Sequence, residues 1–198
     1  MLDSGWAGGA TPAETGQQIE EVVHKHAAGD PATVAVGIDS PSRPLAEPRA
    51  WFWNGRQKNW RRRKGTQRGW GRHSEIVVCA LGLAKPQWTP FEHEAPEWMR
   101  VGFAIFKALG EYPRVYEVFP SASYSVLKDV PEARISIEFS EFVSGPKDML
   151  DACVGALTVR EYSLGRGMKV GNGDGLGAIV LPRKVGGQPP HPVLAWPE

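Results

Sequence analysis

Three short apolar runs, each followed within three residues by a proline, constrain the fold of this chain more than any other feature. They are residues 33–38 (TVAVGI), 115–119 (VYEVF) and 178–181 (AIVL). Runs of this length are typical of buried strands, and proline ends a strand because it has no N–H to donate. Helical patterns alternate with these runs, at residues 12–29, 73–82, 96–109 and 147–163. The alternation predicts an α/β fold.

The rest of the chain adds a few expectations. Residues 135–139 (ISIEF) alternate between apolar and polar, which predicts a half-exposed strand. Residues 184–198 are rich in proline and predict a disordered or extended tail. No apolar run is long enough to span a membrane and no signal peptide is visible, so we expect a cytoplasmic protein. Cys79 and Cys153 lie among apolar residues, which predicts reduced core side chains.

A basic segment at residues 49–73 stands out from an otherwise acidic chain. It holds nine Lys and Arg and no acid, whereas the rest of the chain has fourteen bases and all twenty-two acids. Tryptophans alternate with the arginines, and we expect phosphates to pair with Arg61, Arg62 and Arg63 while bases stack on the indole rings. His73, beside Arg72, is a further candidate for phosphate contact. The alternative is a solvated basic loop whose tryptophans anchor it to the body.

Two acids stand three residues apart at the start of the last helical pattern. Because residues i and i+3 are neighbours on a helix, Asp148 and Asp151 project from one edge. Small neighbours such as Ala152 and Gly155 predict that this helix packs closely on the sheet, which brings Asp151 toward the strand ends. The alternative for Asp148 is a simple helix cap.

Two further acids occupy strand positions. Asp39 follows the first apolar run and Glu117 interrupts the second. A carboxylate in a strand costs free energy unless it faces water, a partner or a cation, and the alternative for each is an edge or solvent-facing position. Carboxylates that converge beside a helix N-terminus form an oxygen site suited to Mg²⁺ or Mn²⁺. Such a site predicts phosphodiester hydrolysis.

Six short sequence blocks together resemble a known family, that of predicted nucleases with a ribonuclease-H-like fold, domain of unknown function 429. The resemblance covers residues 12–183 in the family's order. The blocks are GIDSP (37–41), GRHSE (71–75), PQWTP (86–90), YEVFPSASY (116–124), GPKDMLDA (145–152) and GDGLGAIVLP (173–182).

The resemblance implies a mixed sheet with flanking helices and a carboxylate cluster that binds a divalent metal. The family's acids fall on Asp39, Glu117, Asp148 and Asp151. The Arg and Glu of its GRxxE block fall on Arg72 and Glu75, which we include among the candidate substrate-binding residues.

One departure from the family concerns the N-terminus. Ribonuclease-H-like domains open with three antiparallel strands, but eleven residues precede the first helical pattern here, and Asp3 is the one acid among them. We therefore expect a domain that lacks most of this hairpin. A sheet without it has an open edge, which predicts a homo-oligomer that covers the edge.

Three functional hypotheses follow. The first is a metal-dependent nuclease with the four acids as ligands and residues 49–73 holding the nucleic-acid backbone. The second is a nucleic-acid or partner-binding module that keeps the scaffold without catalysis. The third is an ATP-dependent phosphotransferase, although the chain has no recognisable phosphate-binding loop.

Overall fold

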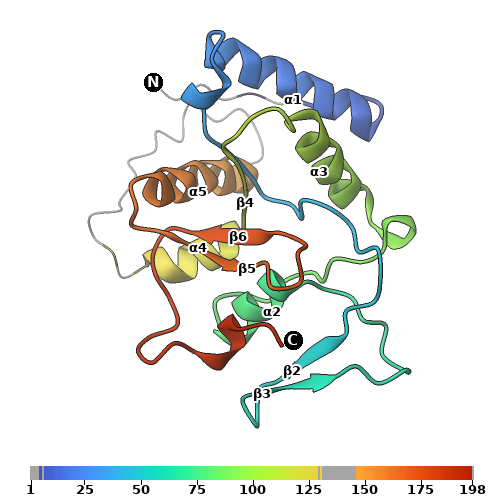
Figure 1. Ribbon diagram of the computed structural model, residues 1–198. Coiled ribbons are helices and arrows are strands. Elements are labelled where there is room, and N and C mark those ends of the chain that lie inside the picture. The colour runs from blue at the N-terminus through green and yellow to red at the C-terminus, as the bar shows by residue number, and fades with distance from the viewer. Residues whose placement is uncertain (1–4, 6, 129, 131–145, 198) are drawn as a thin grey trace.

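The computed structural model describes residues 5, 7–128, 130 and 146–197 and shows a mixed α/β fold (Figure 1). Its main sheet has four strands in the order β1-β4-β6-β5. The first three are parallel and the last is antiparallel to β6. Their bounds are β1 Val36–Ile38, β4 Val115–Val118, β5 Met168–Gly171 and β6 Ala178–Leu181. The three predicted apolar runs are thus confirmed as neighbouring parallel strands.

Helix α5, Pro146–Ser163, packs on one face of this sheet, against β1, β4 and β6. The approach is close because glycine stands on both sides. A Cβ atom at Gly37 would lie 2.8 Å from Cγ2 of Val159 and 3.2 Å from the Gly155 carbonyl oxygen. A larger residue at Gly37 would push α5 away from the sheet, so the small residues of this helix have the packing role that the sequence predicts.

Helix α2, His73–Ala80, packs against β5 and β6 from the other face. Its Ile76 and Val77 join Ile179 and Leu181 of β6 in the larger hydrophobic core. Residues Glu117 and Ile179 are in register, so both side chains leave the sheet on this face. The two faces therefore have different helices, and the acid in β4 lies on the α2 side.

A second core joins α1, Pro12–Ala27, to α3, Glu97–Ala108. Helix α1 begins with a capping box between Thr11 and Glu14 and contributes Val23 and Ala27 to this core. Both helices had been predicted. Two short 3₁₀ turns complete the segments beside them, η1 at Pro31–Thr33 and η2 at Glu92–Glu94.

Several elements differ from the sequence predictions. Pro120 ends β4 as expected, but it also begins helix α4, Pro120–Leu127, which packs on α5. Strand β5 had not been predicted. Cys79 is exposed and Cys153 is partly buried, so the prediction of a core position is wrong for Cys79. The predicted strand at 135–139 and Asp3 lie outside the described residues.

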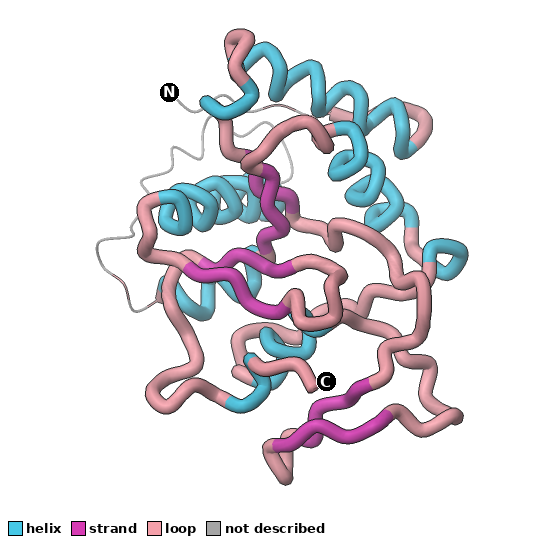
Figure 2. Tube along the Cα trace, viewed as in Figure 1, coloured by secondary structure: helices cyan, strands magenta, loops and turns pink. Residues whose placement is uncertain are grey.

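The basic segment contains a two-stranded antiparallel hairpin, β2 Trp51–Asn54 and β3 Asn59–Arg62 (Figure 2). The C-terminal residues pack beside it through the 3₁₀ turn η5, Pro192–Leu194. Val193 is completely buried, and Nε1 of Trp60 donates a hydrogen bond to the Ala195 carbonyl oxygen at 2.8 Å. The prediction of a disordered or extended tail is therefore wrong for these residues.

Within the described residues, β1 pairs with β4 alone and forms one edge of the main sheet. No helix in the described part of the chain has both the length and the apolar character that a bilayer-spanning segment needs.

Candidate functional site

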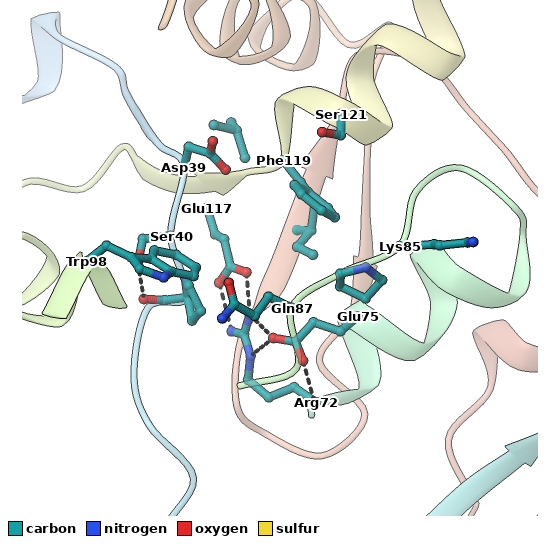
Figure 3. A pocket seen from close by; sticks show the side chains of 14 residues that line it. Asp39, Ser40, Arg72, Glu75, Lys85, Gln87, Trp98, Glu117, Phe119 and Ser121 are labelled. Atoms are coloured by element: carbon teal, nitrogen blue, oxygen red, sulfur yellow. Dashed lines mark hydrogen bonds and ion pairs between the residues drawn. The ribbon is translucent and has the colours of Figure 1, made fainter. Parts of the chain in front are cut away.

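A pocket of about 310 Å³ lies at the carboxyl ends of β1 and β4 (Figure 3). Asp39 enters it directly after β1, and Glu117 enters it from β4. Parallel strands place their carboxyl ends at one edge of the sheet, where the crevice of open α/β sheets forms. Three other segments line the pocket. Arg72 and Glu75 lie at the start of α2, Lys85 and Gln87 lie in the following loop, and Trp98 lies in the first turn of α3.

Arg72 binds the Glu117 carboxylate with two of its nitrogens. Nη1 of Arg72 donates to Oε2 of Glu117 at 2.7 Å, and Nη2 donates to Oε1. The backbone N–H of Ser42 donates to Oε2 of Glu117 at 3.1 Å. Burial alone would lower the pKa of Arg72, but the charges of Glu117 and Glu75 outweigh burial and raise it. This buried pair is a firm ion pair.

Glu75 completes the network from the first turn of α2. Its Oε1 accepts hydrogen bonds from Nε of Arg72 at 3.1 Å and from Nη2 at 3.0 Å. Its Oε2 accepts from the backbone N–H groups of Arg72, at 3.2 Å, and Thr89, at 3.0 Å. Arg72 and Glu75, which the sequence analysis assigns to substrate binding, are buried in this network.

Asp39 differs from Glu117 because none of the described Lys, Arg or His side chains forms a hydrogen bond with its carboxylate. Burial of its carboxylate and the negative charge of Asp151 raise the pKa of Asp39 to about 6; Glu117 adds to this effect and Lys147 opposes it. The residue is exposed as a whole, so solvent and ligands reach it. The carboxyl group of Asp39 therefore titrates nearer to neutral pH than an ordinary aspartate.

Asp151 stands in the second turn of α5, and its contacts are local. Nζ of Lys147 lies 2.6 Å from Oδ2 of Asp151. Burial and a hydrogen bond with Asp151 raise the pKa of the Tyr124 hydroxyl to about 12. Asp148 is exposed in the first turn of the same helix. Asp151 is therefore held in place on the α5 side of the sheet.

The four predicted acids do not form one cluster. Val118 faces α5, since its Cγ2 would lie 3.3 Å from a Cβ atom at Gly155, and its neighbour Glu117 must point to the α2 face. Asp39, at the end of β1, interacts electrostatically with Asp151 on one side and with Glu117 on the other. Among the described residues, no three His, Cys, Asp or Glu side chains are arranged to hold a metal ion.

The available donor set is thus a pair of carboxylates, Asp39 and Asp151. Mg²⁺ commonly binds proteins through one or two carboxylates and fills its other positions with water and substrate phosphate oxygens. Asp39 and Asp151, which interact electrostatically, would hold a cation of this kind only together with water and substrate oxygens. The pair does not fit a metal ion enclosed by protein ligands alone, because Glu117 is engaged by Arg72.

His73 lies away from the pocket in a packed polar setting. Its Nδ1 accepts a hydrogen bond from the Gly173 N–H at 3.0 Å, so Nε2 carries the proton and donates to the Val193 carbonyl oxygen at 2.9 Å. The rings of Trp60 and Trp196 lie against it. Burial lowers the pKa of His73, although the hydrogen bond to Val193 and the charge of Asp174 oppose this effect. Both ring nitrogens are engaged within the protein.

The three consecutive arginines lie at the end of the hairpin. Arg62 stacks over Trp51 with its Cζ atom 4.1 Å from the ring centre. Arg61 donates to the Gln67 side chain at 3.0 Å and Arg63 donates to the Gln67 carbonyl oxygen at 3.0 Å. No acid of the described chain forms an ion pair with any of them. Their charges remain available to an anionic partner.

The sequence analysis did not select Lys85, Gln87, Trp98 or Lys147. The spacing of Lys147 and Asp151, four residues apart on one helix, is a signal that could have identified their ion pair. The first two lie in a proline-rich link without a pattern. Their place in the pocket follows from the path of the loop between α2 and α3.

Comparisons of the chain with protein-family models, with curated proteins and with solved structures found no significant match.

Proposed function

We propose that this protein hydrolyses phosphodiester bonds in nucleic acid with the help of Mg²⁺ or Mn²⁺ bound at Asp39 and Asp151. The observation that carries the proposal is the position of Asp39. Asp39 is exposed as a residue, its carboxylate lies in a pocket at the strand ends, and burial there together with the charge of Asp151 raises its pKa to about 6. A cation between two carboxylates would relieve their mutual repulsion and lower this pKa.

The residues around the pair have distinct roles in the proposal. Asp39 and Asp151 would hold the cation, and the chemistry that it would supply is activation of water and stabilisation of charge on the phosphate. Lys147 holds the Asp151 carboxylate in position. Glu117 orients Arg72 and the loop at Ser42, and so it shapes the pocket without contacting the cation.

Two features support nucleic acid as the substrate. Trp98, which lines the pocket, leaves 45% of its surface exposed, and an exposed indole offers a stacking surface for a base. The arginines of β3 have no acidic partner among the described residues and would bind the phosphate backbone. An indole ring near the acids and the arginines of the basic segment together suit a single-stranded segment of nucleic acid.

The test is a cleavage assay with generic single-stranded RNA and DNA in the presence of Mn²⁺. We expect Asp39→Asn and Asp151→Asn to lower the cleavage rate by at least about 100-fold, because each removes a cation ligand. Glu21→Gln, an exposed change on α1, should leave the rate unchanged and controls for contaminating nuclease. Full cleavage by both aspartate variants would refute the assignment.

The ion pair between Arg72 and Glu117 favours a second candidate function, a module that binds nucleic acid without cleaving it. A nuclease that needs the β4 acid as a ligand would be inactive with that acid engaged by arginine. In this case nucleic-acid binding should weaken steeply with salt, no divalent metal should support turnover, and Asp39→Asn should bind nucleic acid as well as the parent chain.

A cytoplasmic location and self-association at the β1 edge remain predictions of the sequence.

A further inference from the structure

A second pocket, of about 420 Å³, lies between the β2–β3 hairpin, α2 and the C-terminal residues. It has no lining residue in common with the pocket at Asp39. Aromatic rings form much of its wall, through Phe52, Trp53 and Trp88. A volume of several hundred Å³ with a mainly apolar wall is typical of small-molecule sites.

The charged groups of this pocket are all basic. Arg49 and Lys58 line it, His191 contributes an imidazole, and no acidic side chain takes part in the wall. Lys58 is exposed at the end of the hairpin turn, so its ammonium group can reach a bound molecule. A concave surface with apolar rings and two cations matches a ligand with a ring and a negative charge.

Arg49 is the most informative residue of the wall. Its Cζ atom lies 4.1 Å from the ring centre of Phe52 and 5.0 Å from that of Trp88. Its Nε and Nη1 atoms are buried and have no hydrogen-bond partner. Glu75 acts on this guanidinium electrostatically, but both oxygens of Glu75 accept hydrogen bonds from Arg72 and Thr89.

The aromatic contacts explain only part of this environment. A ring next to a guanidinium group stabilises its charge, but it offers no lone pair to the N–H bonds. Buried N–H groups almost always have an acceptor, and an exception calls for a ligand, a water molecule or a function. An anionic oxygen in the pocket would place negative charge beside Arg49, where the described residues provide no hydrogen-bond acceptor.

We propose that this pocket binds a small planar aromatic anion, with the ring against Trp53 and Trp88 and a carboxylate or phosphate group toward Arg49 and Lys58. The proposal does not depend on cleavage at Asp39. A carboxylate on an aromatic ring and the phosphate of a nucleotide share this chemistry. Two pairs of probes distinguish them: 2-naphthoate with 2-naphthamide, and AMP with adenosine.

Cys79 provides a direct readout, because it lines the pocket and is exposed. Alkylation by N-ethylmaleimide, followed by mass spectrometry of the peptides, reports the reaction rate of each cysteine. Cys153, on α5, serves as the internal control. At a probe concentration ten times its Kd, the anion should slow alkylation of Cys79 about tenfold and leave Cys153 unaffected.

The neutral member of each pair should protect Cys79 at least about tenfold less well, because it lacks the charge that Arg49 and Lys58 recognise. Arg49→Gln and Lys58→Gln should each weaken protection by the anion. Arg56→Gln removes a charge from the same hairpin turn but not from the pocket wall. In this variant the anion should protect Cys79 as well as it does in the parent chain.

Three results would overturn the proposal. The first is the absence of protection by either anion at millimolar concentration. The second is equal protection by the charged and neutral probes, which would show that the rings alone bind. The third is a result in which the anion protects Cys79 equally well in Arg49→Gln, in Lys58→Gln and in the parent chain. If Arg49→Gln fails to fold, the charged and neutral probes on the parent chain still decide the question.

Discussion

Arg72, which is buried, and Arg49, which is partly buried, have opposite environments although Glu75 acts on both. Arg72 donates hydrogen bonds to two carboxylates, and its pKa is raised, whereas Arg49 has two buried nitrogens without an acceptor, and burial lowers its pKa to about 10. Both side chains come from the basic segment or its end. The comparison shows that a buried guanidinium contributes to stability only where the fold supplies its acceptors, and that one without acceptors is available for recognition.

The largest effect should come from Arg72→Met. The change leaves the carboxylates of Glu75 and Glu117 buried without a cation, which costs about 3–5 kcal/mol of the free energy of unfolding. Urea denaturation at pH 7 measures the loss. Because burial raises the pKa of Glu117, the loss should shrink at pH 4. A loss below about 1 kcal/mol would show that the network does not hold the strand ends together.

Glu75→Gln should have the next largest effect, since Glu75 interacts with both arginines. The change removes a charged acceptor of Arg72 and the strongest favourable charge on Arg49. We expect a loss of about 2 kcal/mol in the free energy of unfolding. Glu97→Gln, at an exposed site of α3, is the control and should stay within about 0.5 kcal/mol. Equal effects of the two changes would contradict the central place of Glu75.

Asp39→Asn should stabilise the protein at pH 7. The pKa of Asp39 rises from 3.8 in the unfolded chain to about 6 in the fold. The folded state therefore holds this proton more firmly, and the ionised carboxylate costs stability above pH 6 but not below about pH 4. Solvent screening limits the gain of the variant to about 1 kcal/mol. In thermal melts the stability difference between the variant and the parent chain should grow from pH 4 to pH 7; a constant or shrinking difference would be inconsistent with a raised pKa.

Arg49→Met should have the smallest effect, although it is the same substitution as at Arg72. Removal of a cation whose buried nitrogens have no acceptor should change the free energy of unfolding by less than about 1 kcal/mol, and a small gain is expected. The two variants measured side by side in urea make the contrast direct. Similar losses at both positions would mean that Arg49 is a structural residue.

The parts of the fold that the sequence predicted are those with strong local signals. The three apolar runs ended by proline became β1, β4 and β6, and the four helical patterns became α1, α2, α3 and α5. Helix α4 was not predicted because Pro120 was treated only as a strand end, although proline is favoured in the first turn of a helix. The strands of the hairpin are four residues long and do not alternate, which left no period to detect.

The sequence selected the acids of the pocket and Arg72, but not how these residues pair. Asp39 and Glu117 were selected from their strand positions, and the structure places both in one pocket. The partner of Glu117 was not predictable, since Arg72 is 45 residues away and meets it only because α2 begins beside the end of β4. The division of the acids between two sheet faces likewise depends on register, which a sequence without a known topology does not specify.

The packing of the C-terminal residues on the hairpin has a consequence for how the protein matures on the ribosome. Trp60 bonds to the carbonyl group of a residue 135 positions later, and His73 bonds to one 120 positions later. During synthesis these side chains emerge long before their partners exist. Contacts of such long range form late. The hairpin of the basic segment therefore completes its packing only after residues 193–195 have left the ribosomal exit tunnel.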